Sequence, residues 1–372
     1  MTRRGAEAAV LRRPRTLERR RIAFPEVGGD DGILRIEACG LCGTDHEQYT
    51  GHLAAPFGFV PGHEVVGVVE QAGAGALARW GVGLGARVAV EVFMSCRECP
   101  ACVSGAYRRC ERHGLADMYG FIDVEKPPGL WGGYATHLYL APDALLLPVP
   151  GSLDSVVATL FNPLGAGLRW AVELPGTRAG DVVAVLGPGV RGLACSAAAK
   201  SAGAGFVMVT GAGARDAARL AVAPAFGADL VVDVTEDDPV RALRSVTGGL
   251  ADVVVDVTAK APSAPGQALA LVEPAGVVVL AGTRGGIAAD GVGRPGFDPD
   301  LIVYKEVRVL GALGVDAPSY RAALALLASG TYPFAGLPRA AAGFAGIEAL
   351  LRTMAGETRD DPPVHAVFRP GA

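Results

Sequence analysis

The stretch ACGLCGTDHEQYTGH, residues 38–52, gathers several side chains that could hold a metal ion or carry a proton. Its polar residues include Cys39, Cys42, Asp45, His46 and Glu47. Thiolates, imidazoles and carboxylates are the ligands that zinc takes in proteins. A redox-active cysteine pair and a polar loop with two unrelated cysteines are the alternatives, and the stretch by itself leaves all three open.

A second group of cysteines lies in CRECPACVSGAYRRC, with the spacing C-x2-C-x2-C-x7-C. Four thiolates close in sequence suit a tetrahedral zinc site, and such a site is closed to substrate and therefore structural. An iron–sulfur cluster is the alternative, because it also takes four cysteines. We expect a structural zinc lobe over about residues 94–112, with the ligands Cys96, Cys99, Cys102 and Cys110.

A glycine-rich loop follows a valine-rich segment and opens an alanine-rich one. Its glycines are Gly187, Gly189 and Gly192, in the pattern G-x-G-x-x-G. In a strand–loop–helix context these glycines allow a tight turn and the close approach of a diphosphate, which the helix N-terminus then stabilises. We expect this loop, with Val190, to bind a dinucleotide.

The end of the next predicted strand indicates which dinucleotide binds. A site for NAD carries an acidic residue there, which bonds the ribose hydroxyls. This chain has Thr210 and Gly211 instead, and Asp216 is expected to lie too far into the following helix to replace the acid. Small residues accept a 2′-phosphate, and Arg215 or Arg219 would pair with it. The pattern favours NADP(H) over NAD(H).

The predicted elements change in character along the chain. The first 150 residues favour short strands separated by glycine and proline, at 32–39, 64–70, 86–93 and 134–140. From about residue 154, strand-like and helical segments alternate, which is typical of a parallel, doubly wound α/β sheet. Its strands are expected at 181–186, 205–210, 228–234, 251–257 and 276–282. Two helical stretches and a closing strand, HAVFRP, follow residue 314.

Length and charge restrict the classes of function. A chain of 372 residues predicts two or three domains. The net charge of −4 and the lack of a basic stripe argue against nucleic-acid binding. The densest basic run, Arg12 to Arg21, is interpreted as a solvated turn between strands. No apolar run is long enough to span a membrane and no signal peptide is evident, so we expect a cytoplasmic protein.

Taken together, the motifs resemble those of zinc-containing medium-chain dehydrogenase/reductases, the zinc alcohol dehydrogenase superfamily. CGLCGTD is similar to the first zinc segment of that family, and PGHEVVGVV, residues 61–69, to the second. The cysteines at 96–110 match its structural zinc lobe, and the glycine loop falls where its cofactor domain begins. The motifs occur in the family's order over nearly the whole chain.

The resemblance implies roles for the residues of the first stretch. Cys42 and His63 match ligands of a catalytic zinc ion, and Glu64 is either a further ligand or a neighbour of the ligands. Asp45 matches a residue that orients a zinc-ligating side chain. Thr44 matches the residue whose hydroxyl passes on the proton of the alcohol. Cys39 is then a core residue, and its CxxC spacing to Cys42 is accidental.

Two positions depart from the family pattern. The family often has a histidine five residues after the zinc cysteine, as the outer end of the proton relay, whereas this chain has Glu47 there and His46 just before it. The polyol dehydrogenase branch reads Glu-Pro-Leu at its third zinc ligand, whereas this chain has Asn162 in FNPLGAG. An amide oxygen is a poorer zinc ligand than a carboxylate.

The resemblance also implies an architecture. We expect a GroES-like β-barrel catalytic domain from residues 1–155 and 314–372, and a Rossmann dinucleotide-binding domain from residues 156–313. A strand at about 304–314 would pair with another copy, which predicts a homodimer or homotetramer.

The implied function is hydride transfer between NADP(H) and a small alcohol or carbonyl substrate, with two zinc ions per chain. A reductase of C=C or C=N bonds with altered or absent catalytic zinc is the first alternative, which Asn162 and the displaced histidine allow. A non-enzymatic cofactor-binding protein is the second, and the presence of Thr44, Cys42 and His63 argues against it.

Overall fold

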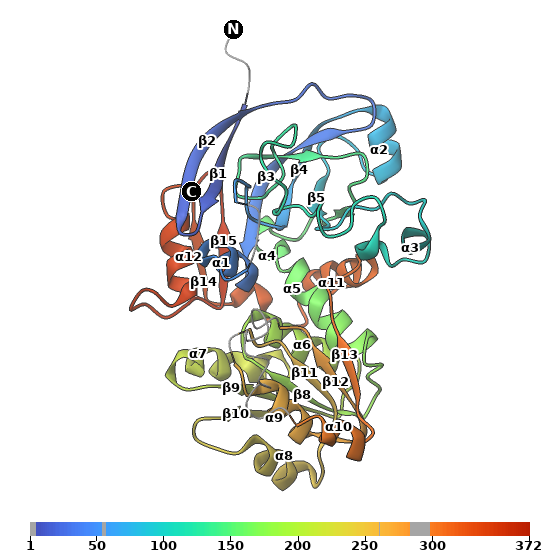
Figure 1. Cartoon of the computed structure of the whole chain (residues 1–372), viewed down its shortest axis with the longest axis vertical. Helices are drawn as coiled ribbons and strands as arrows, with labels where there is room; N and C mark the ends of the chain where they lie inside the picture. Colours follow the sequence, from blue (N-terminus) through green and yellow to red (C-terminus); the bar gives the residue numbers. More distant parts are fainter. Residues whose placement is uncertain (1–4, 54–56, 260, 283–297) are drawn as a thin grey trace. The chain divides into compact units, whose positions relative to one another are not determined.

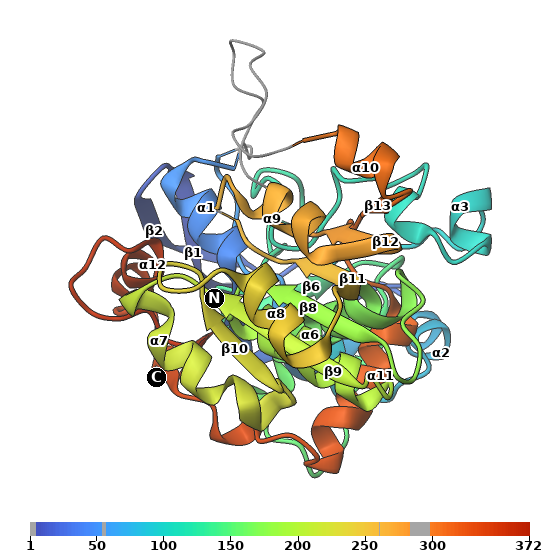
Figure 2. The ribbon, with the colours of Figure 1, turned by 90° about the horizontal axis from the view of Figure 1, so that it is seen from below.

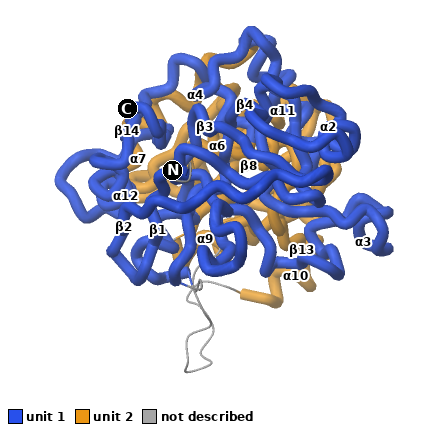
Figure 3. The backbone as a smooth tube through the Cα atoms, turned by 90° about the horizontal axis from the view of Figure 1, so that it is seen from above, with its two compact units in different colours: residues 1–161, 316–330, 334–372 blue, residues 162–315, 331–333 orange. Residues whose placement is uncertain are grey.

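The computed structural model describes residues 5–53, 57–259, 261–282 and 298–372, and these form two compact units. Unit 1 comprises Met1–Phe161, Asp316–Gly330 and Phe334–Ala372, and unit 2 comprises Asn162–Val315 and Thr331–Pro333 (Figure 3). Each unit has a hydrophobic core of its own. None of the helices in the described part of the chain has the length and apolar character that crossing a bilayer requires.

Unit 2 contains a six-stranded parallel sheet with the strand order β10-β9-β8-β11-β12-β13. This is the doubly wound Rossmann order, in which the strand order reverses between the first and fourth strands while all strands stay parallel. Ligands of this fold class bind at the carboxyl ends of the strands on either side of that reversal. The strands are β8 (Val182–Leu186), β9 (Phe206–Gly211), β10 (Leu230–Asp233), β11 (Ala251–Asp256), β12 (Val272–Leu280) and β13 (Arg308–Gly311).

Helices connect these strands and pack against the sheet (Figure 2). Apolar side chains fill both sides of the central strands, as burial between two helical layers requires. The α/β alternation expected from the sequence is confirmed. The helical segments are α5 (Phe161–Leu168), η2 (Arg169–Glu173), α6 (Val190–Ser201), α7 (Ala214–Val222), η3 (Ala223–Phe226), α8 (Pro239–Thr247), α9 (Ala264–Leu271) and α10 (Asp300–Tyr304).

Unit 1 is built on a mostly antiparallel sheet with the order β14-β15-β3-β4-β5-β7, in which β6 also pairs with β3 (Figure 1). Its strands are β3 (Gly32–Leu41), β4 (Glu64–Ala72), β5 (Arg87–Val90), β6 (His137–Leu140), β7 (Leu146–Pro148), β14 (Arg339–Ala342) and β15 (His365–Phe368). Its helical segments are α1 (Gly43–Thr50), α2 (Ala74–Trp80), α3 (Pro100–Val103), η1 (Tyr107–Arg109), α4 (Ser155–Ala158), α11 (Ala317–Ser329), η4 (Phe334–Gly336) and α12 (Ile347–Ala355).

The chain begins in unit 1 with a hairpin of β1 (Gly5–Arg13) and β2 (Thr16–Ala23). The interpretation of residues 12–21 as a turn is therefore wrong for most of the run, because only Pro14 and Arg15 form the turn. The arginines of β2 lie on an exposed strand, where Arg19 pairs with Glu7. Successive side chains of a strand point to opposite faces, so the long charged side chains of this hairpin can lie in solvent while the strand continues.

The pairing of β3 with β4 positions the first zinc segment. The two strands are antiparallel, and Gly40 lies opposite Glu64. Cys42 follows the end of β3 and is the N-cap of α1, while His63 immediately precedes β4. Two residues far apart in sequence are thereby brought to the same end of one strand pair.

A buried contact ties the cysteine loop to the rest of unit 1. Glu91, just after β5, is fully buried, and its Oε2 accepts a hydrogen bond from the Tyr107 hydroxyl at 2.7 Å. The same hydroxyl accepts a hydrogen bond from the backbone N–H of Ala317 at 2.6 Å, at the start of α11. Nearby, Arg108 pairs with Asp316 at 3.4 Å. Burial raises the pKa of Glu91 from 4.5 to about 8.

Replacing Glu91 with glutamine should reduce the pH dependence of stability. The folded protein holds a proton on Glu91 that the unfolded chain releases, so the free energy of unfolding should fall as pH rises from about 4.5 to about 8. Glu91→Gln has a neutral side chain at every pH. Over this range its free energy of unfolding should therefore fall by about 1–3 kcal/mol less than that of the wild type. Urea unfolding at a series of pH values measures this difference. Parallel curves for the two proteins would contradict it.

Candidate active site and metal centres

The structure brings Cys42, Asp45 and His63 together. Their ligand atoms all lie within 4.8 Å of one another, and all three residues are buried. The Cys42 Sγ and the His63 Nε2 are 3.3 Å apart. Two ligands of a tetrahedral zinc ion, one sulfur and one nitrogen, would be about 3.6 Å apart. The thiol and imidazole therefore fit a zinc ion with little adjustment.

Asp45 contacts both of these residues. Its Oδ2 accepts a hydrogen bond from the backbone N–H of Cys42 at 2.8 Å, which caps the first turn of α1. Its Oδ1 lies 3.8 Å from the His63 Nδ1, on the far side of the ring from the Cys42 thiol. A carboxylate beside Nδ1 favours the tautomer that carries the proton on Nδ1, which leaves the lone pair of Nε2 free to bind metal. At 3.8 Å the two atoms are further apart than in a hydrogen bond, so Asp45 lies beside the imidazole without bonding it.

The other residues expected around this centre lie on α1 and β4. Thr44, His46 and Glu47 are on the first two turns of α1. The His46 Nε2 lies 3.2 Å from the Glu47 Oε1, so these neighbouring side chains contact each other. Glu64 is buried at the start of β4, and its carboxylate is directed across to Gly40, where even a Cβ would come within 2.3 Å of Oε2. It is not part of the group formed by Cys42, Asp45 and His63.

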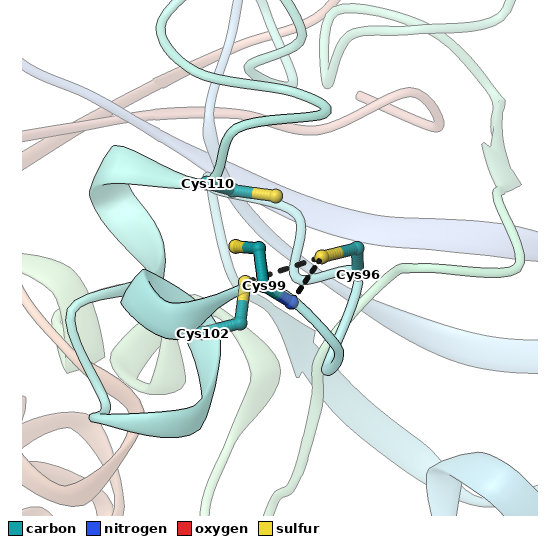
Figure 4. Close-up of side chains that lie close together, drawn as sticks. All are labelled: Cys96, Cys99, Cys102 and Cys110. Carbon is teal, nitrogen blue, oxygen red and sulfur yellow. Dashed lines mark hydrogen bonds between the residues drawn. The ribbon is translucent and has the colours of Figure 1, made fainter.

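The second cysteine group also converges (Figure 4). The ligand atoms of all four residues lie within 4.8 Å of one another, namely Cys96, Cys99, Cys102 and Cys110. The sulfurs of Cys96 and Cys102 are 3.7 Å apart, whereas two thiolates on one tetrahedral zinc ion are about 3.8 Å apart. The four thiols are free and form no disulfide. This donor set fits a closed zinc site.

The surroundings of the thiols differ among the cysteines. Backbone N–H groups of Cys99 and Glu98 lower the pKa of Cys96 to about 6. By contrast, burial raises the pKa of Cys39 well above its ordinary value and that of Cys195 to about 12. Cys39 lies in β3 and Cys195 in α6, both fully buried in the two cores. These two thiols pack as small apolar side chains.

The glycine loop has the backbone that a diphosphate site requires. Gly187 follows β8 with φ at +104°, a conformation that favours glycine. Gly189 is the N-cap of α6, with nothing within 4 Å of the position of a Cβ, and Val190 begins the helix. A Cβ on Gly192 would lie 1.8 Å from the carbonyl oxygen of Gly187, so only glycine allows helix and strand to pack this closely. The loop fits a dinucleotide at the N-terminus of α6.

The Asp216 side chain contacts the loop that follows β9, because its Oδ2 accepts a hydrogen bond from the backbone N–H of Ala212 at 3.0 Å. That it does not replace the acid of an NAD site stays a prediction from the sequence. A Cβ on Gly211 would come within 3.0 Å of the Asp216 Cβ. The same carboxylate pairs with Arg219 at 3.0 Å. The contact with Ala212 is local, because Asp216 lies on the first turn of α7, four residues after Ala212. Thr210 is buried in β9.

Sequence reasoning missed Arg191, which lies inside the glycine motif. Its Nη2 donates a hydrogen bond to the Oδ1 of Asn162 at 3.4 Å, and its guanidinium lies over the ring of Trp170, 5.5 Å from the ring centroid. Asn162 itself is buried in α5. The sequence did offer a signal for this residue, because Arg191 is the one charged side chain in GPGVRGLA, where all other positions are apolar or glycine.

Comparisons with known proteins agree with this geometry. A family model described as alcohol dehydrogenase GroES-like domain matches residues 28–151, and one described as zinc-binding dehydrogenase matches residues 191–329. The probable alcohol dehydrogenase of Mycobacterium tuberculosis is 65% identical over 98% of each chain. The erythritol/L-threitol dehydrogenase of Mycolicibacterium smegmatis is 30% identical over 88% of each chain.

Among solved structures, a zinc-binding dehydrogenase from Sinorhizobium meliloti bound to NADP superposes with a TM-score of 0.82. It is 27% identical, and the match covers 99% of this chain and 100% of the other. The fold, with GroES-like and Rossmann parts, is the one that the sequence motifs predict. The chain therefore belongs to the zinc-containing medium-chain dehydrogenase/reductase family and is an oxidoreductase of the alcohol dehydrogenase type.

Proposed function

We propose that the protein interconverts a small alcohol and its carbonyl compound, using zinc and NADP(H). The observation that carries this proposal is the group of Cys42, Asp45 and His63, which offers a buried thiol and imidazole at zinc-ligand separation with a carboxylate behind the imidazole. A protein that only bound a dinucleotide would not need these residues. In a screen, NADPH should be oxidised by aldehydes or ketones and not by compounds that offer only C=C or C=N bonds.

The residues of unit 1 would hold the metal and move the proton. When bound, zinc would supply Lewis acidity to the substrate oxygen and the nicotinamide would supply or accept hydride. Cys42 and His63 would hold zinc, and Asp45 would fix the imidazole. The Thr44 hydroxyl would accept the proton of the alcohol while donating its own proton onward, and His46 or Glu47, which contact each other, would release that proton to solvent.

The residues of unit 2 would bind the cofactor. Gly187, Gly189, Val190 and Gly192 would form the diphosphate cradle at the start of α6. NADP is bound by the Sinorhizobium meliloti dehydrogenase, and the absence of an acidic side chain at Gly211 supports the same cofactor here. We further propose a cytoplasmic protein that forms a homodimer or homotetramer, for which β13, the last strand in the order of the described sheet, is the candidate pairing edge.

The two arginines of α7 should differ in their contribution to NADPH binding. Arg219 is paired with Asp216, whereas Arg215 is exposed on the first turn of the helix. Arg215→Ala should therefore weaken NADPH binding by about tenfold, or about 1.4 kcal/mol, and Arg219→Ala by less. Asp216→Asn should strengthen it a few-fold, because one negative charge near the phosphate is lost.

Quenching of intrinsic fluorescence by NADPH and NADH measures these affinities. In the wild-type protein NADPH should bind about tenfold more tightly than NADH. If NADH binds as tightly as NADPH, the preference for the phosphorylated cofactor is wrong.

Loss of one thiolate should empty the structural site. Cys99→Ser should reduce zinc content by one ion per chain and lower the melting temperature by about 5 °C or more, because metal binding stabilises a loop with little core of its own. Cys195→Ala removes a thiol outside both clusters and is the matched control for metal content. Metal analysis and thermal unfolding of both variants make the comparison. Unchanged zinc in Cys99→Ser would show that the lobe does not need this ligand.

The site at Cys42 and His63 should hold the more labile of two zinc ions, because it has fewer thiolates than the cysteine lobe. His63→Ala should bind one zinc ion fewer and lose carbonyl reduction by about 100-fold or more, with NADPH affinity unchanged. His137→Ala, which removes a histidine paired with Glu70, is the control and should behave like the wild type. Full activity of His63→Ala would favour a reductase that does not depend on zinc.

A further inference from the structure

Asn162 has a partner that its sequence position does not suggest. It occupies the position at which the resemblance predicts a third zinc ligand, yet its Oδ1 accepts a hydrogen bond from the Arg191 Nη2 at 3.4 Å. Only 3% of Asn162 is exposed, so this contact is shielded from solvent. The two residues join α5 to the first turn of α6, both within unit 2.

A second contact fixes the guanidinium of Arg191. The group lies 5.5 Å from the centroid of the Trp170 ring, at a cation–π distance. Trp170 is itself held, because its Nε1 donates a hydrogen bond to the Gly314 carbonyl at 3.0 Å and only 4% of the residue is exposed. Arg191 therefore has an amide oxygen on one side and an anchored indole on another, which limits the orientations of its planar fork.

This arrangement opposes metal binding by Asn162. A neutral amide oxygen is a weak zinc ligand, and here it already accepts a hydrogen bond from a cation. A zinc ion at the same oxygen would lie close to the guanidinium charge in a poorly solvated place, where like charges repel strongly. By contrast, a negatively charged group would gain from the same surroundings.

We propose that Asn162 is a positioning residue for Arg191 and not a metal ligand, and that the guanidinium held in this way binds an oxyanion. Arg191 is the second residue of α6, where the positive end of the helix dipole adds to its charge. Arginine binds carboxylate and phosphate oxygens through two parallel N–H donors. The inference rests on the proposed function, since the oxyanion is either the cofactor diphosphate or a carboxylate or phosphate of the substrate.

The first measurement concerns the metal. Asn162→Ala should bind the labile zinc ion with an affinity within about twofold of the wild type, as determined by competition with a zinc chelator. A loss of tenfold or more in Asn162→Ala would show that the residue is a ligand and would overturn the proposal. His63→Ala provides the expected behaviour of a true ligand in the same assay.

The second measurement concerns the oxyanion, with NADPH as the probe. Arg191→Met keeps a long apolar stem and removes the charge, and should weaken NADPH binding about tenfold if the diphosphate is the ligand. Asn162→Ala should weaken it about threefold, and the double variant should be no weaker than Arg191→Met, because Asn162 acts through Arg191. Lys200→Met removes a positive charge near the other end of α6, where Lys200 pairs with Asp229, and should leave binding unchanged.

The third measurement identifies the source of the oxyanion by comparing benzaldehyde with para-carboxybenzaldehyde, which differs from it by one carboxylate. If the substrate supplies the oxyanion, Arg191→Met should leave NADPH binding intact and raise KM about tenfold for the carboxylated aldehyde, with little change for benzaldehyde. The proposal is supported if Arg191→Met weakens NADPH binding, or if it raises KM for the carboxylated aldehyde alone. Arg191→Met with unchanged NADPH binding and unchanged KM for both aldehydes would overturn it. Failure of the wild-type protein to bind NADPH or NADH would instead defeat the proposed function, and the inference with it.

Discussion

The antiparallel pairing of β3 with β4 is the constraint on which the candidate active site depends. The register sets Gly40 opposite Glu64, so the residues just beyond each strand end, Cys42 and His63, meet at one point. A shift of one residue would turn every side chain of β4 to the opposite face and separate the thiol from the imidazole. The apolar residues of both strands, buried in the core of unit 1, fix this register. The placement of Cys42 beside His63 thus depends on packing along the whole length of the strand pair.

The two candidate zinc sites differ in what supports them. At the first, one carboxylate oxygen of Asp45 caps α1, and the other lies 3.8 Å from the His63 Nδ1. The four-cysteine lobe contacts the rest of unit 1 through the buried hydrogen bonds of Tyr107 with Glu91 and Ala317. Arg97 adds a hydrogen bond to the Ala144 carbonyl. The hydroxyl of Tyr107 both donates and accepts, so it joins the lobe to β5 and α11.

Unit 2 combines a Rossmann sheet with side-chain contacts that are particular to this chain. The parallel sheet places the glycine loop at the carboxyl end of β8, where α6 presents its N-terminal N–H groups. Within this frame, Arg191 contacts Asn162 and Trp170, and Asp216 contacts the end of β9. Arg191 and Asp216 each lie on the first turn of a helix, α6 and α7 respectively. The same fold serves many reactions, so function has to be argued from local contacts of this kind.

The sequence by itself determined the α/β class and the central strands of the parallel sheet, because hydrophobic periodicity and glycine spacing are local signals. The GroES-like and Rossmann parts followed from the resemblance of the motifs to a known family, and so did the roles expected of Cys42 and His63. Only the tertiary structure decided which partner each polar side chain takes. Asn162 meets Arg191, which lies 29 residues further along the chain, and such a contact between residues distant in sequence leaves no periodic trace in the chain.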